Sequence, residues 1–144
     1  MKRRLTILLL IFAMGLAACQ SAATASPAVV VKGQSITVEG GSYTDVTAAE
    51  LNTMLASKDF TLINVHIPFE GNIAKTDLSV PYDQIELNLG RLPADKNAKI
   101  VLYCRSGRMS SMAARELVGL GYTNIWELSG GMVAWEQAGL KINR

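Results

Sequence analysis

The alternation of short apolar runs with segments at helical spacing is the feature that most constrains the fold of this chain. Buried strands are expected at 61–65, 99–103 and 124–128. Helices are expected at 48–57, 109–120 and from about 129 to 138. Strands that are joined through helices pair in parallel by right-handed crossovers. The order therefore predicts an α/β fold, a small and mostly parallel sheet with helices on both faces.

Local signals refine this outline. Thr47 and Glu50 form a capping box in front of the first helix. The stretch 66–83 is rich in proline and glycine and should be mostly loop, with a short helix at 84–89. Residues 29–38 are β-branched, which predicts a short strand or one arm of a hairpin.

The N-terminus has the layout of a secretory signal. Residues 2–4 are basic, and an apolar run of 14 residues covers 5–18. A membrane-spanning helix needs about 20 apolar residues, so the run favours export over spanning. Small residues precede Cys19, and this pattern resembles the lipobox of bacterial lipoproteins. The resemblance implies cleavage before Cys19 and acylation of its sulfur.

The expected organisation has three parts. Residues 1–18 form a lipoprotein signal peptide, 19–42 hold the lipid-anchored cysteine and a Ser/Ala/Thr-rich tether, and 43–144 form the folded domain. The expected location is the periplasmic or extracellular face of a bacterial membrane. Removing the signal takes the Lys and Arg count from 14 to 11 against 12 acidic residues, so the net charge becomes about −1. Such a chain lacks the basic surface of a nucleic-acid-binding protein.

Cys104 is the candidate nucleophile, because it directly follows the clearest strand and precedes a tight loop and a helix. Backbone amides at a helix N-terminus have no intrahelical partners, and with the helix dipole they favour an anion. Arg105 and Arg108 add two permanent cations. If Cys19 is acylated, Cys104 is the only free thiol. The pattern predicts a thiolate at Cys104 in a loop that can also hold a sulfur oxyanion or a persulfide.

Two motifs carry a family resemblance. The loop resembles the active-site loop of the rhodanese family of sulfurtransferases, and it reads Cys104-Arg105-Ser106-Gly107-Arg108-Met109. The segment 128–140 is similar to the Gly-Gly-x-x-x-Trp-x-x-x-Gly ending of that domain. The resemblance extends from about residue 43 to residue 142.

The resemblance implies covalent catalysis in two steps. Cys104 would attack a sulfane-sulfur donor such as thiosulfate and become a persulfide. The persulfide sulfur would then pass to cyanide or to a thiol. The expected binding loop for the anion and the persulfide consists of Arg105, Ser106, Gly107, Arg108 and Met109. No cofactor and no metal are expected, and the domain is expected to act as a monomer.

The segment after the strand at 61–65 departs from the family pattern. Asn64 stands where the family has Asp, His66 where it has Arg, and Asn72 where it has His. By resemblance, Asn64, His66 and Glu70 form a wall of the pocket, and Glu70 pairs with a loop arginine. Two interpretations follow: an active sulfurtransferase with an altered pocket wall, or a persulfide-binding or sulfur-sensing module with little turnover.

Two other activities are less compatible with the sequence than sulfur transfer. Phosphatases of similar fold use Cys-x5-Arg, whereas the sixth residue after Cys104 is Ser110, so the loop favours sulfur over phosphate. Thiol redox chemistry needs a second cysteine close by, and the sequence has none near Cys104.

Overall fold

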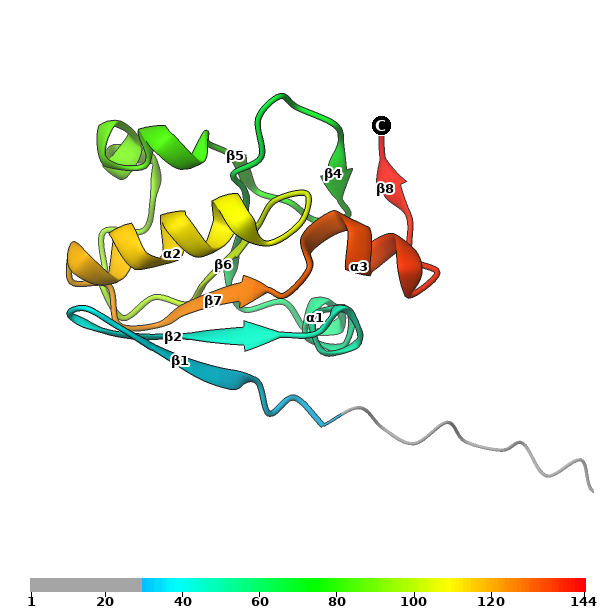
Figure 1. Cartoon of the computed structure of the whole chain (residues 1–144), viewed down its shortest axis with the longest axis horizontal. Helices are drawn as coiled ribbons and strands as arrows, with labels where there is room; N and C mark the ends of the chain where they lie inside the picture. Colours follow the sequence, from blue (N-terminus) through cyan, green and yellow to red (C-terminus); the bar gives the residue numbers. More distant parts are fainter. Residues whose placement is uncertain (1–29) are drawn as a thin grey trace, which may run out of the picture.

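The computed structural model describes residues 30–144, and Figure 1 shows their arrangement. In this part of the chain a six-stranded sheet is combined with three α-helices, two 3₁₀ helices and a two-stranded sheet. The elements are β1 Gln34–Val38, β2 Gly41–Val46, α1 Ala48–Ala56, β3 Thr61–Asn64, β4 Asn72–Ile73, β5 Leu78–Ser79, η1 Tyr82–Gln84, η2 Glu86–Arg91, β6 Ile100–Tyr103, α2 Arg108–Gly119, β7 Ile125–Leu128, α3 Gly131–Gln137 and β8 Ile142–Asn143.

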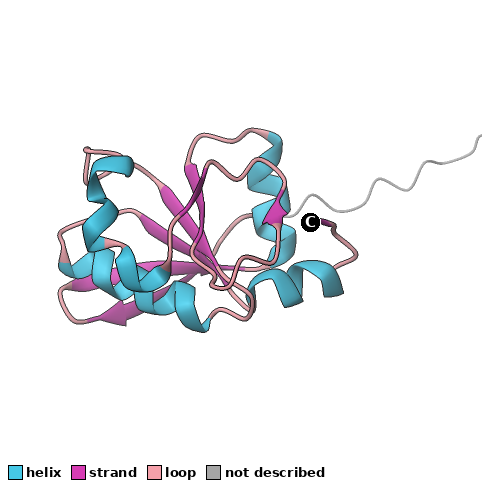
Figure 2. Cartoon of the chain, turned by 90° about the horizontal axis from the view of Figure 1, so that it is seen from above, coloured by secondary structure: helices cyan, strands magenta, loops and turns pink. Residues whose placement is uncertain are grey.

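The main sheet has the strand order β1-β2-β7-β6-β3-β5. All pairs are parallel except the β1–β2 hairpin at one edge. Figure 2 shows helices on both sides of these strands. The α/β fold predicted from the alternation of strands and helices is therefore confirmed.

Each face of the sheet has its own hydrophobic core, because successive strand residues point to opposite faces. In β6, Ile100 and Leu102 pack with buried residues of α2, while Val101 and Tyr103 pack with those of α1 and α3. All four residues of β6 are buried. A strand that is covered on both faces reads as a continuous apolar run, which explains why β6 was the clearest strand in the sequence.

The hairpin of β1 and β2 pairs Gln34 with Asp45 and Val38 with Gly41. It spans the boundary at residue 43 that the sequence suggested between tether and domain, so the folded unit includes residues from Gln34 onward. The predicted strand or hairpin arm is present as β1. The capping box is present as well, since Thr47 Oγ1 accepts from the amide of Glu50, and Glu50 Oε2 accepts from the amide of Thr47.

The loop from 65 to 81 is anchored by short pairings. β4 pairs antiparallel with β8 at the end of the described chain, and β5 pairs with the edge of β3. The predicted helix at 84–89 consists of the two 3₁₀ turns η1 and η2. Between residues 30 and 144, no helix is both long enough and apolar enough to cross a bilayer. The signal segment and Cys19 lie outside the described residues.

Candidate active site

Cys104 lies at the carboxyl end of β6, between β3 and β7 in the sheet. In sheets of this kind, sites form outside the carboxyl ends of the parallel strands. The register pairs Asn64 at the end of β3 with Tyr103, the residue before Cys104. The loop after β3 therefore lies beside the loop after β6, as the resemblance implied.

The loop after Cys104 is held by the start of α3. The amide of Met132 donates to the Cys104 carbonyl at 2.9 Å, and the amide of Val133 donates to the Arg105 carbonyl at 3.0 Å. The close approach requires glycine at position 131, where φ is +56° and a Cβ atom would lie 2.7 Å from the carbonyl carbon of Arg105. This packing gives a physical reason for the Gly-Gly pair in the C-terminal motif.

Two hydrogen-bond donors lie next to the Cys104 sulfur. The amide of Gly107 lies 3.1 Å from Sγ, and the hydroxyl of Ser110 lies 3.3 Å from it. Gly107 caps α2 with φ of +92°, a conformation that turns its amide inward. Cys104 is 1% exposed. The loop thus encloses the sulfur almost completely.

The two arginines of the loop have different surroundings. The Arg105 guanidinium donates to Glu70 Oε2, which is the predicted pairing of Glu70 with a loop arginine. This hydrogen bond lowers the pKa of the Glu70 carboxyl, and the charge of Arg105 adds to the effect. Arg108 is exposed at the start of α2 and has no ion pair with the described residues. Ser106 is exposed, and Met109 is half-buried.

His66 is buried beside this ion pair. Its Nε2 atom lies 3.6 Å from Glu70 Oε2, beyond hydrogen-bond distance, and neither ring nitrogen has a hydrogen-bond partner among the described residues. His66 therefore lies beside Glu70 without a side-chain hydrogen bond to it. Of the predicted wall residues, Glu70 pairs with Arg105 and His66 lies beside Glu70, but neither donates to the sulfur.

Asn64 organises the loop after β3 and does not contact the sulfur. Its Nδ2 donates to the Gly71 carbonyl at 2.9 Å and to Asn72 Oδ1 at 3.0 Å, and its Oδ1 accepts from the amide of His66 at 2.9 Å. Asn72 Oδ1 also accepts from the Tyr103 hydroxyl. Two of the departures from the family pattern, Asn64 and Asn72, are therefore hydrogen-bonded to each other. A carboxylate at 64 has no hydrogens and could not donate to either of these acceptors.

Glu127 and the contacts of Ser110 were not predicted from the sequence. Glu127 on β7 is 3% exposed, and its Oε1 lies 2.5 Å from the Ser110 hydroxyl oxygen. The register places Glu127 beside Leu102 of β6 and Asp45 of β2. The signal was present in the sequence, because strand alternation puts residue 127 on the same face as the buried Ile125.

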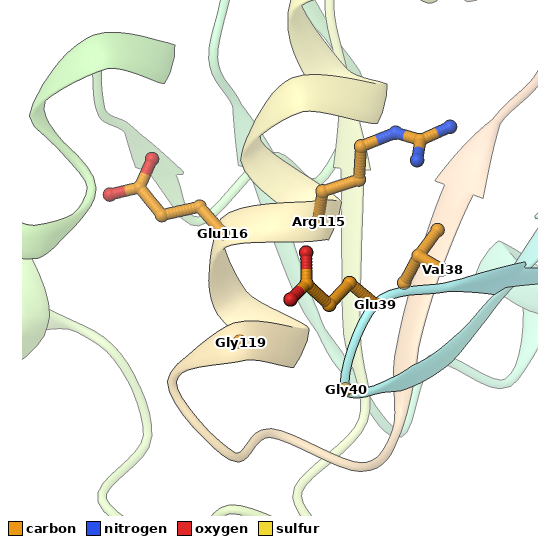
Figure 3. A pocket seen from close by; sticks show the side chains of 6 residues that line it. All are labelled: Val38, Glu39, Gly40, Arg115, Glu116 and Gly119. Atoms are coloured by element: carbon orange, nitrogen blue, oxygen red, sulfur yellow. The ribbon is translucent and has the colours of Figure 1, made fainter.

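A hollow of about 570 Å³ lies at the opposite end of α2 (Figure 3). It is lined by Val38, Glu39, Gly40, Arg115, Glu116 and Gly119. None of the predicted site residues lines it, so this hollow is separate from the cysteine loop. Among residues 30–144, no cluster of three or more His, Cys, Asp or Glu side chains could hold a metal ion.

The site defines a class of protein: a parallel α/β domain with a single cysteine in a loop that leads from the central strand into a helix. The model of the rhodanese-like domain matches residues 47–138, and the chain belongs to that family. A sulfurtransferase of Allochromatium vinosum is 31% identical over 101 residues, which is 68% of this chain and 92% of that protein.

Other relatives have different names and lengths. The tRNA uridine(34) hydroxylase of Erwinia tasmaniensis is 29% identical over 66% of this chain, but the match spans only 28% of the hydroxylase. Among solved structures, a rhodanese-related protein of Thermoplasma volcanium has a TM-score of 0.59 and 29% identity, with 68% of this chain and 95% of that one covered. A thiosulfate sulfurtransferase of Pseudomonas aeruginosa, at 24% identity, shares the fold with a TM-score of 0.61, covering 69% of this chain and 20% of that one.

Proposed function

We propose that this protein is a sulfurtransferase that moves sulfane sulfur from a donor such as thiosulfate to cyanide or a thiol through a persulfide on Cys104. The observation that carries the proposal is the loop after β6, in which the Gly107 amide donates to the Cys104 sulfur. A hydrogen bond from an amide favours the ionised form of a sulfur, and the thiolate is the nucleophile. The similarity to a relative named sulfurtransferase supports the same chemistry.

The reaction balances without a cofactor. The thiolate of Cys104 attacks the outer sulfur of thiosulfate, a sulfur–sulfur bond forms, and the bond to sulfite breaks as sulfite leaves with the electron pair. An acceptor then attacks the outer sulfur of the persulfide and regenerates the thiolate. With cyanide the product is thiocyanate, and with a thiol it is a new persulfide. The charge stays on sulfur in each step, so the loop stabilises a similar anion throughout.

Arg108 is the cation of the loop that supports donor binding in this proposal. Its side chain is exposed and has no ion pair among residues 30–144, whereas Arg105 is paired with Glu70. An unpaired guanidinium at the mouth of the loop can meet the sulfite end of thiosulfate with two parallel hydrogen bonds. Arg105 and Glu70 fix one side of the loop against the segment after β3.

A second candidate function is a persulfide-binding or sulfur-sensing module with little turnover. The burial of Cys104, which is 1% exposed, favours it, because slow access of donor and acceptor would protect a persulfide once it had formed. Both candidates require Cys104 to accept one sulfur atom. They differ in the rate at which that sulfur leaves.

The test combines mass spectrometry with the thiosulfate:cyanide assay. The full-length protein in detergent is treated with thiosulfate, and we expect a gain of one sulfur atom on Cys104, release of sulfite and catalytic formation of thiocyanate. Cys104→Ser should lose all three, and Cys19→Ser is the matched control that keeps them. A gain of sulfur with negligible thiocyanate would select the binding module. Thiocyanate formation that survives Cys104→Ser would overturn both.

The same proposal includes the location of the protein. An exported lipoprotein with an acylated Cys19 would carry the domain on the periplasmic or extracellular face of a bacterial membrane, because several buried acyl chains give a stable anchor. The supporting observation is the signal-like sequence of residues 1–19. Metabolic labelling with a radioactive fatty acid should mark the wild type and not Cys19→Ser. Equal labelling of the two would contradict the anchor.

A further inference from the structure

A buried hydrogen-bond chain runs from Glu127 through Ser110 to the Cys104 sulfur. Ser110 is fully buried in the first turn of α2, and its hydroxyl lies 2.5 Å from Glu127 Oε1, 3.1 Å from the Gly107 carbonyl and 3.3 Å from Cys104 Sγ. The chain lies on the side of the sulfur that faces the protein interior. The three residues of this hydrogen-bond chain come from β7, from α2 and from the end of β6.

The hydroxyl of Ser110 has only one hydrogen, although three acceptors surround it. An ionised Glu127 would attract that hydrogen, because a charge-assisted hydrogen bond to a carboxylate is stronger than one to a carbonyl. A protonated Glu127 has a hydrogen of its own and can donate it to Ser110. The protonation state of Glu127 therefore decides whether the Ser110 hydrogen is available to the sulfur.

The surroundings of Glu127 favour the protonated form. Burial is the main cause that raises the pKa of Glu127 to about 9; the contact with Ser110 opposes the rise, and the neighbouring Asp45 carboxyl adds to it. Tyr43, also on β2, faces the same group, and so does the Cys104 sulfur. The cation on this side, Arg115 of α2, lies close enough to Tyr43 to oppose the rise in the pKa of its hydroxyl. Asp45 Oδ1 is buried and has no hydrogen-bond partner among the described residues.

We propose that Glu127 is a positioning residue for the reaction of Cys104, which in its protonated form donates to Ser110 and so directs the Ser110 hydroxyl toward the thiolate. The Cys104 thiolate then accepts two hydrogen bonds, from Gly107 on the loop side and from Ser110 on the interior side. This inference rests on the proposed function only in taking Cys104 as the nucleophile. It adds a buried acid that the sulfur depends on without touching it.

The thiolate titration of Cys104 tests this chain. The full-length protein with Cys19→Ser has Cys104 as its only thiol, and ultraviolet absorbance follows thiolate formation as the pH is raised. We expect Ser110→Ala to move the midpoint upward by about one pH unit, a tenfold loss of thiolate below the midpoint, because a hydrogen bond to the charged sulfur is lost. Glu127→Leu should act in the same direction, since the donor to Ser110 is removed.

The Glu127→Gln variant tests whether Glu127 is protonated in the wild-type protein. The glutamine amide also donates, so the conservative variant should keep the wild-type midpoint, a rescue that a merely space-filling role for Glu127 would not produce. If Glu127 is ionised instead, its replacement removes a negative charge beside the thiolate and the midpoint must fall clearly below that of the wild type. That fall would overturn the proposal. An unchanged midpoint in Ser110→Ala would also overturn it, whether or not Glu127→Leu folds.

The titration does not depend on sulfur transfer. A protein that titrates as expected but releases no sulfite from thiosulfate contradicts the proposed function and leaves the role of Glu127 standing. Conversely, normal thiocyanate formation together with a lowered midpoint in Glu127→Gln contradicts the role of Glu127 alone.

Discussion

The packing of Gly131 against the cysteine loop can be tested by three glycine substitutions that differ in one property at a time. At Gly131, φ is +56° and an added Cβ would lie 2.7 Å from both the carbonyl carbon and the oxygen of Arg105. At Gly121, φ is +88° and nothing lies within 4 Å of the added atom. Gly119 ends α2, and an added Cβ there is also free of neighbours.

The expected free-energy changes follow from these geometries. Gly119→Ala should be neutral or stabilise the fold by up to about 1 kcal/mol, because alanine loses less entropy in a helix. Gly121→Ala should cost about 1–2 kcal/mol, the strain of a left-handed backbone with a side chain. Gly131→Ala has the same strain and an overlap with backbone that cannot rotate away, which adds about 1–3 kcal/mol. The total of about 2–5 kcal/mol is a large share of the stability of a small domain.

Urea denaturation followed by circular dichroism measures the three free energies of unfolding. The free energy of unfolding should be highest for Gly119→Ala, lower for Gly121→Ala and lowest for Gly131→Ala. Gly131→Ala should also lower sulfur loading of Cys104, because the overlap displaces the carbonyls that α3 holds. A free energy of unfolding for Gly131→Ala within experimental error of that for Gly121→Ala would refute the tight contact. Normal sulfur loading in a clearly destabilised Gly131→Ala would show that this contact supports the fold alone.

Two further predictions concern buried polar groups. Asn64→Asp should lower the free energy of unfolding at neutral pH by about 1–3 kcal/mol, because a carboxylate would face the Gly71 carbonyl and Asn72 Oδ1 without a hydrogen to donate. Adding Asn72→His should recover part of this loss in a double-mutant cycle. Strict additivity of the two free-energy changes would refute the coupling. Glu127 has a pKa raised from 4.5 to about 9 in the folded protein, so its contribution to stability is fully present below pH 4.5 and is lost as the pH rises toward 9. Relative to Glu127→Gln, the wild type should therefore lose up to about 1.4 kcal/mol per pH unit between about pH 5 and about pH 8 in urea titrations, and parallel curves would contradict a buried acid.

Part of the candidate site could be predicted because its signals are local. The apolar run of β6, the glycine at 107 and the helical spacing after Arg108 are enough to place Cys104 at the end of a strand and beside a helix N-terminus. The capping box at Thr47 and Glu50 was predicted for the same reason, since its donors and acceptors lie within one turn. Local geometry depends on residues that are adjacent in the sequence, so it can be predicted from one sequence alone.

The surroundings of the sulfur could not be predicted, because they join residues far apart in the sequence. The partner of Cys104 on the interior side is Ser110, but the acid behind it, Glu127, comes from another strand. Asn64 was predicted as part of a pocket wall, but its hydrogen bonds are made to Gly71 and His66 within the loop after β3. The choice among these partners is made by strand register and by burial, not by spacing along the chain.

By itself the sequence determined that strands and helices alternate and that a cysteine stands at the junction of one strand with one helix. Tertiary structure alone decided that this sulfur is enclosed, and that Glu127 is brought behind it by the pairing of β7 with β6 and β2. The physical reason is that backbone conformation is set by adjacent residues, whereas the charge state and access of a buried group are set by whatever the fold packs around it.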